Sequence, residues 1–191
     1  MDFVEGLPKA RGFEVVLVVV DRLSKYGHFL PLKHPYIAKT IEDLFIKEVI
    51  RLHEFPSSIV SDRDKIFISH FWKEMFRLVG TKLNKSIAYY PQFDGQTEVV
   101  NKGLETYLWC FYSEKPKEWL SWLLWAKFWY NTTFQRALRV SPFKVVYGHK
   151  PPLLLSYGRG KASNSMQDEQ LRERDIILAA LREHLILDNS K

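Results

Sequence analysis

The chain has 191 residues, of which 46% are hydrophobic and 15% aromatic, which is enough apolar surface to form a core. This composition excludes a globally disordered chain, and the length fits one domain of ordinary size plus a tail. The formal net charge is +6 and the pI is about 9.3. A basic balance of this kind favours a polyanionic partner such as nucleic acid.

Several classes of protein are excluded by what the sequence lacks. Cys110 is the single cysteine, so an internal disulfide is impossible, and the six histidines form no zinc-ligand pattern with it. The sequence contains no apolar run of the roughly 18 residues that a membrane span needs, and residues 1–8 do not resemble a signal peptide. We therefore expect an intracellular, reduced, soluble chain without a targeting signal.

The first part of the chain predicts a β-meander. Residues 13–20 are almost all β-branched or apolar and end at Asp21, a pattern typical of a buried strand. Shorter strands are expected over residues 2–5 and 29–32. A helix over 40–53 follows, capped by Thr40, with an apolar face made of Ile41, Leu44, Phe45, Val49 and Leu52.

The second part alternates strands with helices. A strand over 57–61 brings Asp62 to its C-terminal end. Ser69 caps the next helix and Gly80 ends it, with a buried stripe of Trp72, Met75, Phe76 and Val79.

Further elements are a strand over 82–88 and helices over 96–111, 117–131 and 141–147, the last beginning with Ser-Pro. The core face of the first of these helices is expected to contain Val100, Leu104, Tyr107, Leu108 and Phe111. This order of elements predicts an α/β sandwich with a mixed sheet.

Three acidic residues stand out by their positions. Asp2 lies on the first strand, Asp62 ends a buried strand, and Glu98 lies in the first turn of a helix. If the first and fourth strands are neighbours, Asp2 and Asp62 project into one crevice, and the helix brings Glu98 to them. Clustered carboxylates repel each other unless cations are present. Two Mg²⁺ ions, about 3.5–4 Å apart, would resolve this and clamp both oxygens of a phosphodiester displacement.

Taken singly, each acid has an ordinary explanation. An Asp at a strand end is most often a turn former, and a Glu in the first turn of a helix is most often a dipole partner or part of a capping box. Only the joint spacing and the sequence context of Asp2, Asp62 and Glu98 favour a metal site.

That context resembles the integrase core of gypsy-type LTR retrotransposons. The segments IVSDRDKIF (59–67) and AYYPQFDGQTEVVN (88–101) carry the resemblance, together with MDFVEGLP (1–8), VVVDRLSKYGHF (18–29) and SPFKVVYG (141–148). The 35 residues 63–97 separate Asp62 from Glu98, the spacing of the integrase DDE motif. The resemblance extends from Met1 to about Pro152.

The resemblance implies an RNase H-like fold with a mixed five-stranded sheet flanked by helices. It implies that Asp2, Asp62 and Glu98 are the catalytic, metal-binding triad for two Mg²⁺ (or Mn²⁺) ions. The activity is that of a polynucleotidyl transferase and endonuclease, which trims the element's DNA ends and joins the new 3′-OH to target DNA. The implied partners are DNA and further copies of the chain, and no small-molecule cofactor or membrane. The implied location is the nucleus, after a cytoplasmic particle stage.

Further residues near the triad are candidates for DNA contact. Lys102 lies one turn beyond Glu98 on the same helix face, within reach of a phosphate, or is a solvated surface lysine. Asn101 is a candidate to orient Glu98 or to contact DNA. The loop and helix start that in integrases lie over the DNA end contain Gln92, Asp94 and Gln96; the alternative is a plain connector.

Two further features have competing interpretations. Asp21 also ends a buried strand and is the rival of Asp2 for the first acid position, although the family pattern places that acid in the MDF segment. Four tryptophans recur at spacings of three and four: Trp119, Trp122, Trp125 and Trp129. This spacing favours a packed helix face or a subunit interface over base stacking.

The domain organisation follows from the resemblance and from a change of composition after Pro151 and Pro152. We expect the core over 1–152, a linker over 153–165 and a charged helical tail over 166–191, leading to a C-terminal domain that this chain lacks. We also expect this chain to lack the zinc-binding domain and the earlier part of strand one that precede the core in integrases. Tyr90 replaces the usual His, and Gly103 interrupts a helix at a cost of about 1 kcal/mol.

Three functional hypotheses remain. The first is a DNA strand-transfer core. The second is a catalytically dead retrotransposon remnant, or polyprotein fragment, that folds and binds DNA or self-associates. The third is a ribonuclease H-type nuclease, against which the spacing of Asp62 and Glu98 and the GQTE segment (95–98) argue.

Overall fold

The computed structural model describes residues 1–61, 66–67, 69–85, 95–112, 116–152, 172 and 175. The chain divides into two compact units, Met1–Pro151 and Pro152–Lys191. In the second unit, residues 172 and 175 are helical, and Pro152 is the only other residue described. The linker predicted over 153–165 lies outside the described residues and, with the helical tail, stays a prediction.

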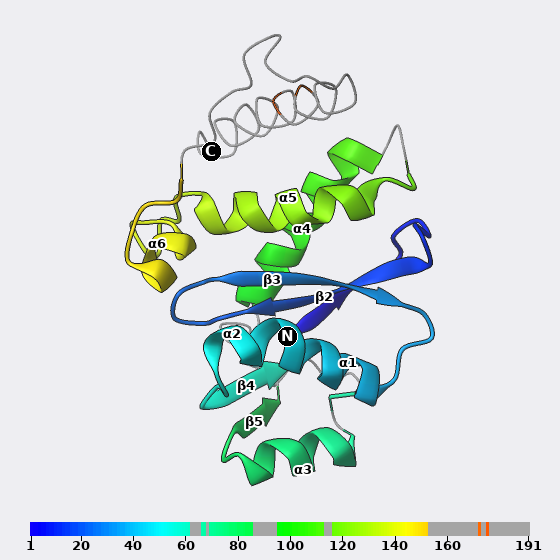
Figure 1. The fold of residues 1–191 in the computed structure, drawn as a ribbon, viewed down its shortest axis with the longest axis vertical. Coiled ribbons are helices and arrows are strands. Elements are labelled where there is room, and N and C mark those ends of the chain that lie inside the picture. Colours follow the sequence, from blue (N-terminus) through cyan, green and yellow to red (C-terminus); the bar gives the residue numbers. More distant parts are fainter. Residues whose placement is uncertain are drawn as a thin grey trace, which may run out of the picture. The chain divides into compact units, whose positions relative to one another are not determined.

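An antiparallel meander forms the centre of the first unit. Strands β1 (Asp2–Val4), β2 (Phe13–Val20) and β3 (Gly27–Lys33) are hydrogen-bonded in the order β1-β2-β3 (Figure 1). All three predicted strands are confirmed, and β3 is longer than expected because its ladder with β2 continues to Gly27, opposite Val20. Residues 15–18 of β2 are almost completely buried, as its unbroken apolar sequence predicts.

A second, parallel pair joins β4 (Ser58–Ser61) to β5 (Lys82–Lys85). The described residues therefore form sheets of three and two strands, and the prediction of one five-stranded sheet is wrong for them. A hydrogen bond of 2.7 Å from the Met1 ammonium to the Val60 carbonyl oxygen connects β4 to the start of β1.

One face of the meander is covered by a helical segment made of α1 (Ala38–Phe45), the π-helical turn η1 (Ile46–Ile50) and α2 (Arg51–His53). The predicted Thr40 cap is wrong, because the helix begins at Ala38 without a side-chain cap. Leu52, predicted to be buried, is 47% exposed. The wider π turn shifts the helical phase, which turns Leu52 away from the core that Ile41 contacts.

Helix α3 (His70–Leu78) packs against α1, and Ser69 caps it as predicted by accepting a hydrogen bond from the Trp72 amide. Val79 is exposed, contrary to prediction, because the helix ends before it. The rings of Phe45, Trp72 and Phe76 contact one another at centroid distances of 5.0–6.1 Å. This aromatic cluster fills the core between α1 and α3.

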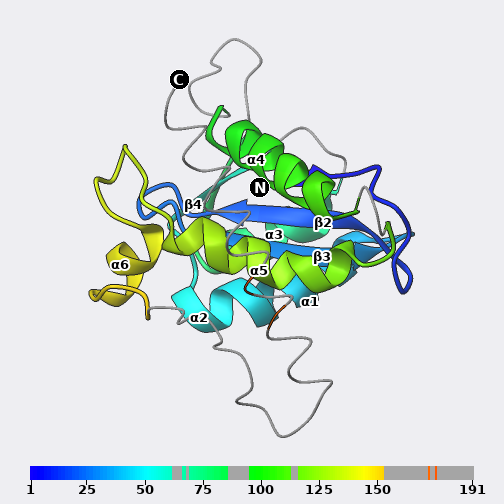
Figure 2. The ribbon, with the colours of Figure 1, turned by 90° about the horizontal axis from the view of Figure 1, so that it is seen from above.

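The other face of the meander is covered by α4 (Gly95–Tyr112) and α5 (Trp119–Thr132), which lie over it in Figure 2. The α4 face formed by Val100, Leu104, Tyr107 and Leu108 is buried as predicted. Trp119 is fully buried and donates to the Pro8 carbonyl oxygen, and the Trp129 ring stacks on Tyr107. These contacts support the packed-face interpretation of the tryptophans.

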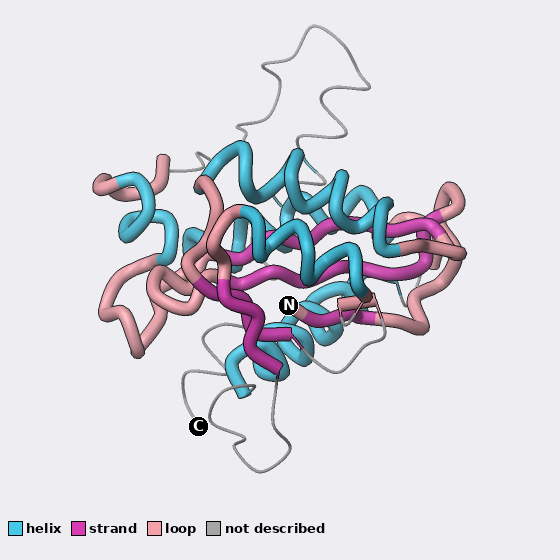
Figure 3. The backbone as a smooth tube through the Cα atoms, turned by 90° about the horizontal axis from the view of Figure 1, so that it is seen from below, coloured by secondary structure: helices cyan, strands magenta, loops and turns pink. Residues whose placement is uncertain are grey.

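The short helix α6 (Pro142–Tyr147) contacts α5 and begins with the predicted cap, since the Ser141 hydroxyl accepts from the Lys144 amide. Helices thus lie on both sides of the meander, which the backbone tube shows from below (Figure 3). In the part of the chain that the structure describes, no helix is both long enough and apolar enough to span a membrane.

Asn131 joins α5 to β3. Its side chain accepts a hydrogen bond from the Gly27 amide at 2.8 Å and donates to the Gly27 carbonyl oxygen at 2.9 Å. Asn131 is only 2% exposed, so its removal would leave both backbone groups of Gly27 buried without partners.

We predict that Asn131→Ala lowers the free energy of unfolding by about 2–5 kcal/mol, because two buried polar groups lose their partners. Chemical denaturation measures this change. Asn84, exposed on β5, provides the control, and Asn84→Ala should change stability by no more than about 0.5 kcal/mol. Equal effects of the two substitutions would contradict the role of Asn131.

Candidate metal and DNA site at the start of helix α4

Asp2 lies at the start of β1, opposite Val18 of β2. Its Oδ2 accepts a hydrogen bond from Asn101 Nδ2 of α4 at 2.6 Å, and its Oδ1 accepts from the Phe3 amide at 2.8 Å. A hydrogen bond to a carboxylate is short and strong because one partner is charged. The contact therefore ties α4 to β1 at the first of the three predicted acids.

Glu98 lies three residues before Asn101 in α4, and its backbone is helical. Positions three residues apart are neighbours on a helix surface. The Asn101–Asp2 hydrogen bond thus brings the turn of α4 that contains Glu98 close to β1, while the Glu98 side chain lies outside the described residues.

Asp62 follows directly after Ser61, the last residue of β4, and lies outside the described residues. The Met1–Val60 hydrogen bond places the end of β4 beside the start of β1. Segments that contain or adjoin all three acids therefore meet at the beginning of β1. The structure describes the side chain of Asp2 alone among them.

The role of Asn101 was missed by the sequence interpretation, which assigned it to Glu98 or to DNA. Asn101 is half-buried and donates to Asp2, and its Oδ1 is buried without a partner among the described groups. Its position one turn after Glu98 was the available signal.

The predicted DNA-contacting residues are only partly described. Lys102 is exposed on α4. Gln96 is helical, although its side chain is not described, and Gln92 and Asp94 lie outside the described residues.

Asp21 has the ordinary role of a turn former. Its Oδ2 accepts hydrogen bonds from the amide and the hydroxyl of Ser24, at 2.7 and 2.5 Å. Burial alone would raise the pKa of Asp21, but the hydrogen bonds from Ser24 and Leu23 and the charge of His53 together outweigh burial and lower that pKa. Its carboxylate is thus committed to the turn between β2 and β3, whereas Asp2 contacts α4.

The carboxylate oxygens of Asp2 are suitable ligands for a hard cation such as Mg²⁺. Each carboxylate oxygen accepts one hydrogen bond and keeps a further lone pair, and carboxylate oxygens are the ligands that Mg²⁺ prefers. Among the described residues, no three His, Cys, Asp or Glu side chains lie close enough together to hold a metal ion. The other two members of the predicted triad, Asp62 and the side chain of Glu98, lie outside the described residues.

A cavity of about 400 Å³ lies between the end of β2 and β4, and Met1 forms part of its wall. The Asp21 amide donates to the Tyr26 carbonyl oxygen just before β3, so by alternation the backbone groups of Val20 point to the opposite edge of β2. The Ser57 carbonyl oxygen accepts from the Lys82 amide of β5, so the backbone groups of Ser58 point away from β5. Val20 and Ser58 both line the cavity.

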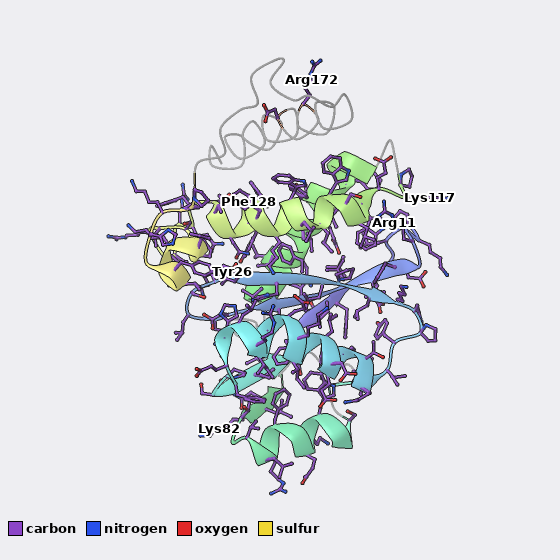
Figure 4. The ribbon with its side chains drawn as sticks, in the orientation of Figure 1. Arg11, Tyr26, Lys82, Lys117, Phe128 and Arg172 are labelled. Carbon is purple, nitrogen blue, oxygen red and sulfur yellow. The ribbon has the colours of Figure 1, made fainter. Side chains whose placement is uncertain are left out.

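Two histidines line another part of this cavity. His28 Nε2 of β3 lies 3.0 Å from His53 Nε2 of α2. The ring of Tyr26, which is labelled in Figure 4, packs against both imidazoles. Burial, followed by the positive charge of Lys127 and by His53, lowers the pKa of His28 to about 3. Burial also lowers the pKa of His53, against the opposing effect of Asp21. Both imidazoles are therefore neutral at neutral pH.

No family model matches the chain. Over all 191 residues it is 31% identical to the Transposon Tf2-3 polyprotein of Schizosaccharomyces pombe (strain 972 / ATCC 24843), and equally to the Tf2-4 polyprotein. The chain spans 14% of the length of each of these relatives.

Solved structures of integrases have the same fold. A chain of the simian T-cell lymphotropic virus intasome, in complex with PP2A regulatory subunit B56 gamma, matches 85% of this chain with a TM-score of 0.64 and 17% identity; the match covers 59% of that chain. The HTLV-2 integrase catalytic core domain in complex with magnesium (trimeric form) matches 76% of this chain and 94% of its own, with a TM-score of 0.60 and 15% identity.

The catalytic core domain of BIV integrase matches 77% of this chain and 92% of its own, with a TM-score of 0.58 and 16% identity. The fold is therefore the RNase H-like fold of integrase catalytic cores. The chain thus has an integrase-like core fold, and all of it is similar to a part of retrotransposon polyproteins.

We predict that extending the chain with β-forming residues ahead of Met1 raises both its melting temperature and its Mg²⁺ affinity. The added strand would bond to Val20 and Ser58 and would hold Asp2 more rigidly. Isothermal titration with Mg²⁺ measures the affinity. The control is an extension of equal length with Pro at the positions whose backbone amides would donate to the neighbouring strands, since Pro lacks the amide hydrogen. Equal Mg²⁺ affinity with and without the extension would contradict the prediction.

We also predict a pH dependence of stability from His28. Its folded pKa lies below its unfolded value of about 6.5, so the stabilisation is complete above pH 6.5 and is lost as pH falls below it. At about pH 5 the loss is roughly 2 kcal/mol. Denaturant titrations at about pH 7.5 and 5 should show this loss in the parent chain and a smaller loss in His28→Gln. An unchanged pH dependence in His28→Gln would refute the assignment.

Proposed function

We propose that the chain is the catalytic core of an integrase that inserts retroelement DNA into target DNA. The reaction would comprise metal-dependent processing of the DNA 3′ ends followed by strand transfer. The observation that supports this most directly is the Asn101–Asp2 hydrogen bond, which brings the α4 turn with Glu98 close to the first acid. The magnesium complex of the HTLV-2 integrase core supports the use of a divalent ion.

In this proposal Asp2, Asp62 and Glu98 hold two Mg²⁺ or Mn²⁺ ions. When bound, these ions neutralise the charge that develops on the phosphate oxygens during transfer. Asn101 is a positioning residue, because it restrains the Asp2 carboxylate through its amide hydrogen. The protein supplies no nucleophile of its own and acts by orienting and neutralising the DNA phosphate.

The DNA would lie over the start of α4. The exposed ammonium of Lys102 lies four residues after Glu98 and is proposed to bind a phosphate. Gln92, Asp94 and Gln96 are proposed to contact the DNA end, and Asn101 is a second candidate for such contact. The net charge of +6 favours binding to any DNA sequence.

Further proposals concern the assembly. The trimeric form and the intasome among the similar structures support a homo-oligomer. We propose the domain limits 1–152, 153–165 and 166–191 for the longer product, and the nucleus as the site of action. The alternative function is a folded core that binds DNA or self-associates without catalysis, and the strand-transfer assay separates the two.

We predict that the chain joins a labelled DNA duplex to target DNA with Mg²⁺ or Mn²⁺. Glu98→Gln should reduce the joined product by at least about 100-fold, since even partners of metal ligands matter about 10–100-fold. Glu105→Gln, an exposed change further along α4, is the matched control and should retain activity. Products that persist in Glu98→Gln would refute the assigned triad. No product from any chain, with circular dichroism showing a folded protein, would favour the non-catalytic alternative.

We further predict that DNA binding weakens steeply with salt. A plot of log affinity against log salt concentration should become shallower by about one unit in Lys102→Gln, which loses one phosphate contact. Fluorescence anisotropy with labelled duplex measures the slope. Lys73→Gln, on the exposed side of α3, should leave the slope unchanged. An unchanged slope in Lys102→Gln would exclude its phosphate contact.

A further inference from the structure

A pair of imidazoles in the cavity between β2 and β4 has no role in the proposed reaction. His28 comes from β3 and His53 from α2, and their Nε2 atoms lie 3.0 Å apart with ring planes at 76°. His28 is 3% exposed, whereas His53 is exposed. Both residues line the cavity of about 400 Å³.

The pair has hydrogen-bonding capacity left over. Two neutral imidazoles at this distance share one hydrogen between their Nε2 atoms. The Nδ1 of His28 is buried and has no hydrogen-bond partner among the described residues. The described groups therefore do not fix the tautomer of His28, and its hydrogen is free to occupy Nδ1, which leaves Nε2 as a metal ligand.

We propose that His28 and His53 bind a zinc-type transition-metal ion through their Nε2 atoms, with water from the cavity completing the coordination. Zn–N bonds are about 2.0–2.1 Å long, so two nitrogens on one ion lie about 3.0 Å apart at a right angle and about 3.4 Å apart at a tetrahedral angle. The observed 3.0 Å falls at the short end of this range. No metal-binding group of three such side chains occurs among the described residues, which supply His28 and His53 as the two protein ligands of this site.

Charged side chains near His28 and His53 affect the affinity of this pair for a metal cation. The Asp21 carboxylate lies in the wall of the same cavity and interacts electrostatically with His53, which favours a bound cation. Lys127 of α5 acts on both histidines with the opposite sign and opposes it. Removing the Lys127 charge should therefore strengthen metal binding.

This site differs in chemistry from the proposed catalytic one. Imidazole nitrogens select Zn²⁺, Co²⁺, Ni²⁺ and Cu²⁺, whereas Mg²⁺ takes oxygen ligands. Excess Mg²⁺ therefore competes at the carboxylates and leaves the histidines available. The proposal does not depend on strand-transfer activity, and either can fail without the other.

Equilibrium dialysis of the full chain against Zn²⁺, at about pH 7.5 with excess Mg²⁺, tests the proposal. One Zn²⁺ should bind per chain. His53→Gln, at an exposed position that tolerates substitution, should weaken binding at least about tenfold, and Lys127→Gln should strengthen it. His149 is an exposed histidine just after the end of α6, and His149→Gln should leave the Zn²⁺ affinity unchanged.

A thermal melt gives a second readout, since an ion that binds only the folded chain raises the melting temperature. Zn²⁺ should stabilise the parent chain and His149→Gln, and should stabilise His53→Gln markedly less. No saturable Zn²⁺ binding by the parent chain, or equal affinity in His53→Gln, would overturn the proposal.

Discussion

The contact between α4 and β1 is the constraint on which the candidate site depends. It consists of one charge-assisted hydrogen bond, from the Asn101 amide to the Asp2 carboxylate, supported by the buried face of α4. Hydrogen bonds to charged groups contribute about 1.5–3 kcal/mol net, a large share of the stability of a small domain. Without this hydrogen bond, the Asp2 carboxylate would lose its link to α4, and the apolar packing of α4 would remain.

The central strand β2 makes this arrangement possible. Its residues are buried on both faces, so α4 and α5 pack on one side and the α1–α2 segment on the other. β1 pairs with the outer edge of β2, and β4 approaches β1 through the Met1–Val60 bond. The sheet thereby holds together the start of β1, the end of β4 and the start of α4, which are distant in sequence. The proposed metal site lies at the edge where they meet.

The sequence predicts those features that depend on neighbouring residues. The apolar run of β2, the Ser69 and Ser141 caps and the buried face of α4 follow from local patterns, and the structure has them. Features that depend on tertiary packing were not predictable. The π turn that exposes Leu52 has no sequence signature, and the 3.0 Å contact between His28 and His53 joins residues 25 positions apart. Family motifs pointed to Asp2, whereas the Asn101 contact emerged only from the fold.

The most direct test of the account is a crystal structure of the chain with Mn²⁺ and a short DNA duplex, with anomalous scattering used to locate the ions. Two Mn²⁺ peaks are expected, about 3.5–4 Å apart, bound by the carboxylates of Asp2, Asp62 and Glu98 beside a DNA phosphate. Asp21 should keep its hydrogen bonds to Ser24. Ordered carboxylates without Mn²⁺, or Mn²⁺ bound by Asp21 in place of Asp2, would contradict it.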